Sequence, residues 1–219
     1  MVNAQNLRQP SVSNVISDLV PDEGQIEQFL RQLAAPWERQ ADQLGLMEVR
    51  FLAEGRQPQV SRFLMQCCDR AVDHIVQQNS AGMNAYVCVN PVNSKVDSAA
   101  NNAATDNDIL GAHFVFVDCD DLGGAERVAK SNLPYDMCVM TGQIPFVRQH
   151  FYWQLQKPLF DLLRWRQLQK RLIAAYETDA VIQNPSRIMR IAGTITYPSP
   201  IKKERGYVSE LATFQMVGA

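Results

Sequence analysis

The chain has 219 residues, of which 46% are hydrophobic and 20% charged, a composition that fits one large globular domain or a core with a small helical appendage. No apolar run approaches the ~20 residues of a membrane helix, and no basic-then-apolar signal pattern opens the chain, so we expect a cytoplasmic protein without a membrane partner. Its five cysteines include no CxxC pair, which argues against a disulfide framework and against a zinc site.

The N-terminal part of the chain has mainly helical patterns. Residues 1–20 are polar and are predicted to form a loose tail. One helix is predicted from Asp22, a suitable N-cap, and a second helical pattern runs from Gln57 to Gln78. The apolar positions that define the first helix are Ile26, Phe29, Leu30 and Leu33. We therefore expect residues 21–80 to form a helical N-terminal part.

The middle of the chain is predicted to contain two strands separated by a polar segment. The first strand spans Ala85–Val89 and is ended by Asn90 and Pro91. The segment Lys95–Asp108 is rich in Asn, Ala and Asp, and it is either a surface insertion or a mobile lid over a site. The second strand, Phe114–Asp121, is apolar and ends in carboxylates, which makes it the most informative stretch of the sequence.

The C-terminal part alternates between strand and helix patterns. A short helix is predicted at Gly124–Ser131, followed by two strands at Met137–Thr141 and His150–Leu155. A long helix is predicted from Pro158 to Tyr176, followed by two closing strands at Arg187–Ile191 and Tyr207–Phe214. The long helix has a single apolar stripe that includes Trp165 and Leu172, which core packing explains. From Phe114 on, the order strand–helix–strand–strand–helix–strand predicts an α+β fold with a split βαβ, RRM-like sheet.

Asp118 and Asp120 are the first candidate site residues. Because side chains on a strand alternate between its faces, these two carboxylates point the same way, whereas Cys119 points into the core. Two carboxylates on one side of a strand end can bridge divalent ions, and paired ions of that kind clamp the attacking and leaving oxygens of a phosphoryl transfer. The alternative is that Asp120 or Asp121 caps the following helix.

Three further features each have a functional and a structural interpretation. His150 opens a strand just ahead of two aromatic residues, where it is either a ligand or a packed structural residue. Asp179 follows the long helix and is either a third carboxylate of the site or a turn residue. Arg187 and Arg190 precede Gly193 on a short segment, where guanidinium forks can bind phosphate or remain solvated.

Taken in chain order, three short motifs resemble those of the archaeo-eukaryotic primase superfamily. They are VFVDCDD, then TG followed by RQHFYWQL, then TDAVIQNPSRIMRIAGT, and the resemblance covers residues 84–205. The most similar branch comprises the primase and primase-polymerase domains of plasmid and phage replication proteins. The chain departs from this branch in the seven residues between Gly142 and His150, and in Ala192 and Thr196, where proline and asparagine are common. These departures bear on the shape of the nucleotide pocket more than on its chemistry.

The resemblance implies an RRM-like catalytic sheet with N-terminal helices, and a primase-type catalytic core over residues 81–219. It implies a DNA primase or primase-polymerase, a nucleotidyltransferase that joins NTPs or dNTPs on a single-stranded DNA template in the replication of a plasmid, phage or mobile element. Two Mg²⁺ or Mn²⁺ ions are the expected cofactors, since oxygen ligands select hard ions. The implied metal ligands are Asp118, Asp120 and Asp179, and the implied triphosphate ligands are His150, Arg190 and Arg148. A helicase, in trans or in a longer parent polypeptide, is the expected partner.

The charges are unevenly distributed along the chain. From Arg148 to Arg205 there are eleven Lys and Arg against four Asp and Glu, a balance of +7, whereas the remainder carries ten against nineteen, or −9. Such an asymmetry favours a polyanionic partner. The predicted nucleic-acid contacts are Arg164, Arg166, Lys170 and Arg171 on the long helix, with Lys202 or Lys203 as further phosphate contacts. A solvated surface explains these side chains equally well.

Three other functions use parts of the same pattern. A metal-free module that binds single-stranded nucleic acid or a replication origin would not need the three acidic residues together. A haloacid-dehalogenase-type phosphatase shares the DxD strand and the Thr141-Gly142 turn, but no paired acids follow residue 141. A rolling-circle nickase needs a His-x-His pair, which the three histidines of the chain do not form. No GxxxxGK[ST] phosphate loop is present, so any unwinding motor is expected elsewhere.

Overall fold

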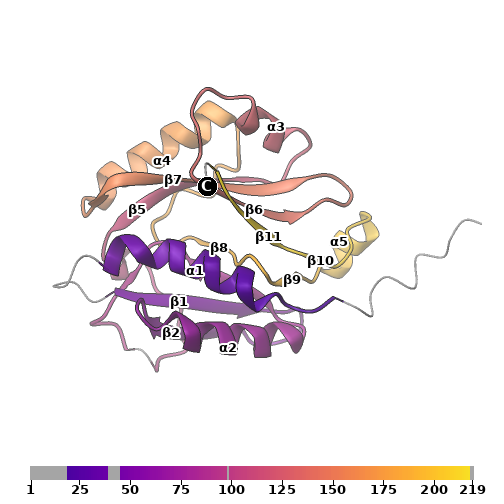
Figure 1. Ribbon diagram of the computed structural model, residues 1–219, viewed down its shortest axis with the longest axis horizontal. Helices are drawn as coiled ribbons and strands as arrows, with labels where there is room; N and C mark the ends of the chain where they lie inside the picture. Colours follow the sequence, from indigo (N-terminus) through magenta and orange to yellow (C-terminus); the bar gives the residue numbers. More distant parts are fainter. Residues whose placement is uncertain (1–18, 39–44, 98, 218–219) are drawn as a thin grey trace, which may run out of the picture.

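The structure, a computed structural model, describes residues 19–38, 45–97 and 99–217. Two antiparallel sheets form its centre, and helices cover them (Figure 1). The predicted tail, residues 1–20, lies outside the described residues except for its last two. Within the described ranges, no helix is long and apolar enough to cross a membrane.

The first sheet, here called the N-terminal sheet, has the strand order β2-β1-β3-β8, with β4 paired to β1. Its strands are β1 (Gly45–Leu52), β2 (Gln59–Leu64), β3 (Asn84–Cys88), β4 (Val92–Asn93) and β8 (Ile188–Arg190). The helices α1 (Glu23–Glu38) and α2 (Cys68–Ser80) lie along it (Figure 1). Because β8 comes from the C-terminal half, this sheet joins distant parts of the chain.

The second sheet, here called the central sheet, has the order β11-β6-β7-β5. Its strands are β5 (Ala112–Cys119), β6 (Met137–Gly142), β7 (Arg148–Leu159) and β11 (Thr213–Met216). The helices α3 (Gly124–Ala129) and α4 (Leu162–Tyr176) lie on its side away from the N-terminal sheet (Figure 1). A ribbon of β9 (Ile195–Thr196) and β10 (Glu210–Leu211) flanks the short helix α5 (Pro200–Glu204). The succession β5-α3-β6-β7-α4 confirms the predicted α+β, RRM-like fold class.

The last strand of the predicted order, β8, pairs with β3 and does not close the central sheet. The free edge of β5 is covered by α4 instead. The buried Gln169 side chain accepts a hydrogen bond from the Phe116 N–H at 3.2 Å and donates one to the Phe116 carbonyl at 2.6 Å, as a neighbouring strand would. The indole N–H of Trp165 donates to the Phe114 carbonyl at 2.8 Å. One helix thus satisfies the backbone groups that an edge strand leaves open.

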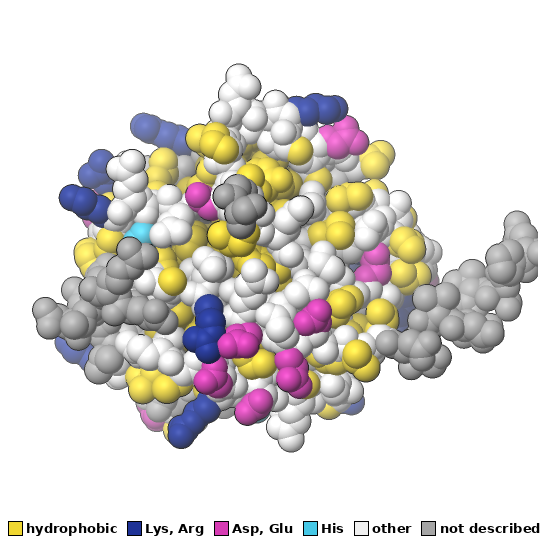
Figure 2. Space-filling model, viewed as in Figure 1, with side chains coloured by type: hydrophobic (Ala, Val, Ile, Leu, Met, Phe, Trp, Pro, Cys, Tyr) yellow, Lys and Arg dark blue, Asp and Glu magenta, His cyan; other side chains and the backbone are white. Residues whose placement is uncertain are grey.

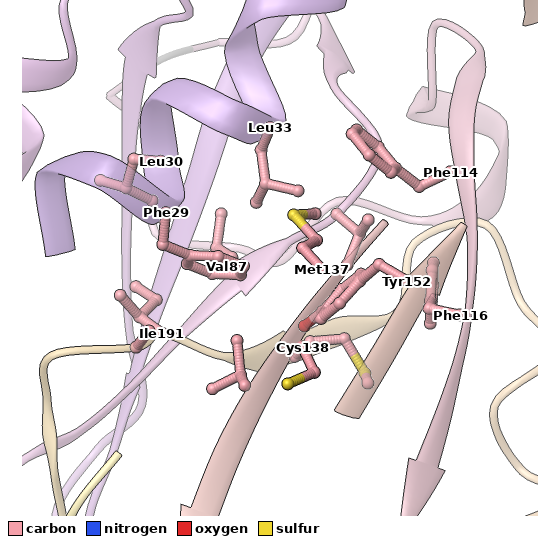
Figure 3. Close-up of a cluster of buried hydrophobic side chains, with 14 of the residues drawn as sticks. Phe29, Leu30, Leu33, Val87, Phe114, Phe116, Met137, Cys138, Tyr152 and Ile191 are labelled. Atoms are coloured by element: carbon pink, nitrogen blue, oxygen red, sulfur yellow. The ribbon is translucent and has the colours of Figure 1, made fainter. Parts of the chain in front are cut away.

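A large cluster of buried hydrophobic side chains fills the space between the two sheets (Figure 3). The ring of Phe29 in α1 lies 5.8 Å from the ring of Tyr152 in β7 and 5.6 Å from that of Phe214 in β11. Leu33 of α1 and Val87 of the N-terminal sheet are buried in the same cluster. Since full burial of one such side chain contributes about 1.5–3 kcal/mol, α1 is a major link between the sheets.

The N-terminal predictions are confirmed only in part. The helix α1 follows Asp22, whose carboxylate accepts a hydrogen bond from the backbone of the first turn at 3.0 Å. The predicted helix Gln57–Gln78 is wrong over its first half, which is strand β2, and right for its second half, which is α2. Val60 and Phe63 have the spacing of a helical turn, but pairing with the unpredicted strand β1 fixes them in a sheet. The described part of residues 21–80 therefore contains two strands besides the two helices.

Two boundaries in the C-terminal half also differ from the prediction. Strand β7 continues to Leu159, so Pro158 lies in the strand, and α4 begins only after Asp161, whose carboxylate caps its first turn. The segment Tyr207–Phe214, predicted as one strand, contains β10 and the start of β11. Capping and strand pairing set these limits, and hydrophobic spacing alone does not reveal them.

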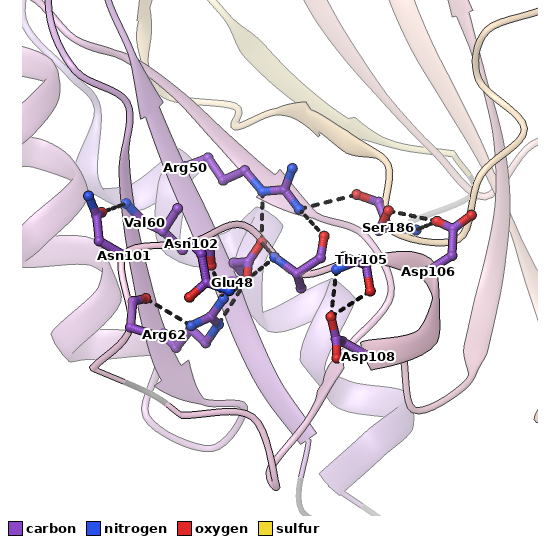
Figure 4. A network of polar contacts seen from close by, with 12 residues as sticks. Glu48, Arg50, Val60, Arg62, Asn101, Asn102, Thr105, Asp106, Asp108 and Ser186 are labelled. Carbon is purple, nitrogen blue, oxygen red and sulfur yellow. Dashed lines mark hydrogen bonds and ion pairs between the residues drawn. The ribbon is translucent and has the colours of Figure 1, made fainter.

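The polar segment Lys95–Asp108 is held against the N-terminal sheet (Figure 4). Arg62 of β2 donates to three of its backbone carbonyls, at distances between 2.6 and 3.0 Å. The fully buried Glu48 of β1 binds Arg62 and accepts a hydrogen bond from the N–H of Ala104. Of the two alternatives for this segment, these contacts favour the anchored insertion over the mobile lid.

Candidate active site

Asp118 lies at the C-terminal end of β5 and Asp120 directly follows the strand, and both are on the side that faces the N-terminal sheet. Asp118 is opposite His150 of β7, while Val117 and Cys119 are buried on the other side of the strand. Both carboxylates line a cavity of about 460 Å³ between the sheets. Asp120 does not cap the next helix, because the N-cap of α3 is a glycine with no side-chain hydrogen bond. The structure thus gives both carboxylates to the cavity.

His150 is buried beside the first of these carboxylates. Its Nε2 lies 3.6 Å from Asp118 Oδ1, and its Nδ1 lies 3.5 Å from the Tyr152 hydroxyl. Burial, followed by the positive charges of Arg190 and Arg187, lowers the pKa of His150 to about 3. The imidazole is therefore neutral at physiological pH and can act as a hydrogen-bonding group, but not as a cation.

The surroundings of Asp118 shift the pKa of its carboxyl group strongly. Its side chain is 26% exposed, within a recess that the protein surrounds. Burial, followed by the negative charges of Asp120 and Asp179, raises the pKa of Asp118 to about 7, although the charges of Arg187 and Lys202 oppose the rise. A carboxyl that is perturbed by both desolvation and neighbouring acids, and that lines a cavity, is a candidate functional group.

Arg148, at the start of β7, ties together the rim of the cavity. Its side chain is 6% exposed, and its guanidinium binds Glu210 at 2.9 Å and two carbonyls of the turn 143–147. The same guanidinium lies 4.6 Å from the centre of the Tyr207 ring, and its Nε is 3.7 Å from an oxygen of Asp120. Arg148 therefore has a structural role at the rim of the cavity. Its role in triphosphate binding stays a prediction.

Arg190 and Arg187 line the opposite wall of the cavity. Two residues of β3 orient Arg190, whose guanidinium donates to Asn84 Oδ1 at 2.8 Å and to the Tyr86 hydroxyl at 2.7 Å, and lies 4.6 Å from the Tyr86 ring centre. Among the described residues, the Arg187 side chain forms no hydrogen bond or ion pair. One arginine is thus pre-oriented, and the other has its donors available to a ligand.

The predicted third carboxylate, Asp179, lies near the pair but does not line the cavity. Its Oδ1 accepts a hydrogen bond from the Val181 N–H at 2.9 Å, as in the turn-residue alternative, yet its charge still raises the pKa of Asp118. No group of three or more His, Cys, Asp and Glu arranged to hold a metal occurs in the described part of the chain. Asp118 and Asp120 nevertheless fit a hard divalent ion, which would neutralise the repulsion between these acids.

The predicted nucleic-acid contacts occupy two separate surfaces. On α4, Arg164, Lys170 and Arg171 are exposed and none of them lines the cavity, whereas Arg166 forms an ion pair with Asp106. On α5, Lys202 lines the cavity, and its ammonium lies 3.5 Å from a carboxylate oxygen of the site. Figure 2 shows basic side chains over α4 and acidic ones gathered over α1 and α2, as the charge asymmetry of the sequence suggests.

Two antiparallel sheets enclose the cavity, with the carboxylates on one side and the arginines on the other. This arrangement of strands is the fold of archaeo-eukaryotic primase (AEP) domains. Its structure is similar to the AEP domain of the cyanophage S-2L primase-polymerase, with a TM-score of 0.62 and 21% identity over 92% of this chain and 94% of that one. The predicted resemblance to this superfamily is thereby confirmed at the level of the fold.

Two structures of another protein, the primase RepB′, are also similar. One matches 87% of this chain and 56% of its own length, with a TM-score of 0.57 and 14% identity. The other, the catalytic domain in complex with initiator DNA, matches 85% of this chain and 84% of its own length, with a TM-score of 0.53 and 16% identity. No protein-family description and no curated protein matches the sequence.

Sequence reasoning missed part of the cavity lining. Asn84 and Tyr86 orient Arg190, but they lie on a strand that carries no motif. The alternation of that strand, in which Ala85 is buried, could have placed both on the opposite face. Arg187 was visible as part of a basic segment, yet only the fold shows that it faces Asp118.

Proposed function

We propose that the chain is a DNA-dependent nucleotidyltransferase, a primase or primase-polymerase that joins NTPs or dNTPs on a single-stranded template during replication of a plasmid, phage or mobile element. The observation that carries the proposal is that Asp118, Asp120, Arg187 and Arg190 all line one cavity. Carboxylates suit divalent cations and guanidinium groups suit phosphates, so the cavity offers complementary groups to a metal-bound triphosphate. Two structural neighbours, a primase-polymerase domain and a primase in complex with initiator DNA, support it.

In this proposal Asp118 and Asp120 hold Mg²⁺ or Mn²⁺, and Asp179 serves as the third ligand. Bound ions of this kind neutralise charge on the triphosphate and polarise the attacking 3′-hydroxyl. The pKa of about 7 at Asp118 means that metal binding has to displace a proton from this carboxyl near neutral pH. The ammonium of Lys202, which lies beside Asp120, partly neutralises the negative charge of the site before a metal binds.

The arginines and the histidine form the phosphate-binding side of the proposal. Arg190 is pre-oriented by Tyr86, so it loses little freedom on binding, while Arg187 supplies a further guanidinium. His150, being neutral, donates one hydrogen bond to a phosphate oxygen. Arg148 contributes mainly by holding the rim around Tyr207, where its charge also reaches the metal ligand Asp120.

The alternative function is a metal-free module that holds single-stranded nucleic acid. Such a module would use the basic residues, but it would gain nothing from Asp118, whose ionisation inside the cavity is unfavourable. The combination of a perturbed acid with a second acid and two arginines therefore favours the enzyme. A helicase, in trans or in a longer parent polypeptide, is its proposed partner.

A primer-synthesis assay on single-stranded DNA, with labelled NTPs or dNTPs and Mn²⁺, tests the proposal. The substitution Asp118→Asn keeps the shape of the side chain and removes its charge, so we expect it to abolish synthesis. Asp121→Asn is the matched control, because Asp121 directly follows Asp120 in the sequence but pairs with Arg127 outside the cavity. Synthesis by the Asp118→Asn protein would refute the proposal, and DNA binding without synthesis by the unmodified chain would favour the module.

A further inference from the structure

Asp106 lies outside the cavity and binds two other segments of the chain, the turn that contains Ser186 (Figure 4) and the helix α4. Its Oδ1 accepts hydrogen bonds from the Ser186 N–H at 3.1 Å, from the Ser186 hydroxyl at 2.7 Å and from the Asn184 side chain at 3.5 Å. Its Oδ2 accepts one from Arg166 of α4 at 2.6 Å. Partial burial raises the pKa of Asp106, but the hydrogen bonds from Ser186 and Asn184 and the charge of Arg166 outweigh it, so the group stays ionised.

The turn that Asp106 binds, Asn184–Arg187, is also held from other directions. The fully buried Asn90 donates to the Pro185 carbonyl at 2.9 Å, and Arg50 donates to the Ser186 carbonyl at 3.5 Å. Within the turn, the Arg187 N–H donates to the Asn184 carbonyl at 3.1 Å. Neither Asn90 nor Arg50 lines the cavity, so these contacts act on the turn and not on a ligand.

Asp106 is itself firmly placed. It begins the short helix η3 (Asp106–Asp108), which is closed by a capping box between Thr105 and Asp108. Just before it, the Ala104 carbonyl accepts a hydrogen bond from Arg50 at 3.1 Å, and Arg50 is fixed by the buried Glu48 at 2.7 Å. A rigid anchor of this kind transmits position from the N-terminal sheet to the turn.

We propose that Asp106 is a positioning residue that acts through Ser186 to aim the Arg187 guanidinium into the cavity. The proposal rests on the proposed function, in which Arg187 binds the triphosphate. Ser186 directly precedes Arg187, so the two hydrogen bonds that Ser186 makes to Asp106 fix the start of the arginine's backbone. A shift of 1 Å at a binding group can cost roughly 100-fold in rate, so we expect the anchoring of the Arg187 backbone to matter for ligand binding.

The test measures binding of a non-hydrolysable dNTP analogue with Mg²⁺ by calorimetry. We expect Arg187→Ala and Asp106→Ala each to weaken binding by about 10-fold or more, and the double substitution to be no weaker than Arg187→Ala alone, because residues that act as one unit are not additive. Asp97→Ala is the matched control, since Asp97 is an exposed acid of the same polar segment whose carboxylate accepts a hydrogen bond from the Ala99 N–H and, among the described residues, none from the turn Asn184–Arg187. It should leave the affinity unchanged.

A milder variant and a second measurement test the proposal even if the Asp106→Ala protein does not fold. Ser186→Ala keeps the ion pair between Asp106 and Arg166 and removes the hydroxyl contact, so we expect a smaller loss of affinity in a folded protein. Hydrogen exchange at the Ser186 amide should accelerate in Asp106→Ala but not in Asp97→Ala.

The outcomes separate this inference from the proposed function. If Arg187→Ala weakens binding and Asp106→Ala does not, the positioning role is overturned and the proposed function stands. Effects that multiply in the double substitution also overturn the positioning role, since Asp106 would then act independently. Unchanged affinity in both single substitutions would overturn the inference together with the phosphate-binding role of Arg187.

Discussion

His150 Nε2 lies 3.6 Å from Asp118 Oδ1, and folding reverses the order of the two pKa values. In water the imidazole has the higher pKa, whereas in the folded protein the carboxyl has it. The pKa of His150 is lowered from 6.5 to about 3, and that of Asp118 is raised from 3.8 to about 7. Between roughly pH 4 and 6.5 the folded pair therefore carries its proton on the carboxyl, whereas the unfolded chain carries it on the imidazole. Folding changes the location of this proton but not the number bound.

The first prediction concerns the pH dependence of stability without metal. The raised pKa of Asp118 contributes stability that is complete below pH 3.8 and is lost as the pH rises to about 7. Asp118→Asn removes this loss, so the free energy of unfolding of the variant, relative to the wild type, should increase with pH across that window by up to about 1.4 kcal/mol per pH unit. Urea unfolding in EDTA at a series of pH values measures the difference.

Substitution of the partner provides the opposite sign as a control. The lowered pKa of His150 destabilises the fold as the pH falls from 6.5 to about 3, because the unfolded chain then binds a proton that the folded protein excludes. A His150→Asn protein should therefore gain stability relative to the wild type as the pH falls. Equal pH profiles for the wild type and both variants would contradict the assignment.

The second prediction is that Mg²⁺ or Mn²⁺ raises the thermal midpoint of unfolding. A ligand at 100 times its Kd stabilises the folded state by about 2.7 kcal/mol, and Asp118→Asn or Asp120→Asn should remove this effect while Asp121→Asn retains it. Because Asp118 must lose its proton, the metal affinity should increase from pH 6 to pH 8. A reduced but measurable shift in Asp179→Asn would fit a third ligand, and an unchanged shift would exclude Asp179 from the site.

How much of this molecule the sequence could predict depends on the range of the interactions. Alternation along one strand placed Asp118 and Asp120 on the same side, and capping located the start of α1, because both are local effects. The strand β2 was mistaken for helix because its identity comes from pairing with β1, which no local pattern showed. In the same way, Arg187 and Asp118 line one cavity because β8, which directly follows Arg187, pairs with β3 of the N-terminal sheet. That pairing joins residues about 100 positions apart, and no local pattern predicts it.

The third prediction separates the two arginines that border Asp118 and Asp120. Arg148→Ala leaves Glu210, 15% exposed, without its ion pair, and should lower the free energy of unfolding by about 3 kcal/mol. Arg187→Ala should leave the stability nearly unchanged and weaken nucleotide binding, since the Arg187 side chain lines the cavity. Urea unfolding and calorimetry on both proteins test the distinction. An Arg148→Ala protein of normal stability that fails to bind nucleotide would instead support a direct role for Arg148.

The fourth prediction concerns the edge of β5. Gln169→Leu leaves the Phe116 N–H and carbonyl, and the Ile182 carbonyl, without the side chain that binds them. Each buried group left unsatisfied costs about 1–3 kcal/mol, so we expect a loss of about 3 kcal/mol in urea unfolding and faster hydrogen exchange at the Phe116 amide. Gln167→Leu, at an exposed position of the same helix, is the control and should have little effect. Similar stability of both variants would show that α4 does not act as the missing strand.

The last prediction concerns the DNA-binding surface. If the exposed cations of α4 neutralise phosphates, the logarithm of the affinity for single-stranded DNA should fall linearly with the logarithm of the salt concentration, with a slope of about −0.7 per contact. The substitutions Arg164→Glu and Lys170→Glu together should make that slope shallower and should do so equally for different template sequences, because backbone contacts carry no base information. Arg166 is unsuitable for this test, since its ion pair with Asp106 belongs to the positioning network. Arg70→Glu with Lys95→Glu, two exposed positions outside the basic stretch, is the matched control for the change in net charge. An equal change of slope in both pairs would show that only the net charge matters. An unchanged slope in the α4 pair would contradict template binding at α4 and would favour the α5 side of the cavity.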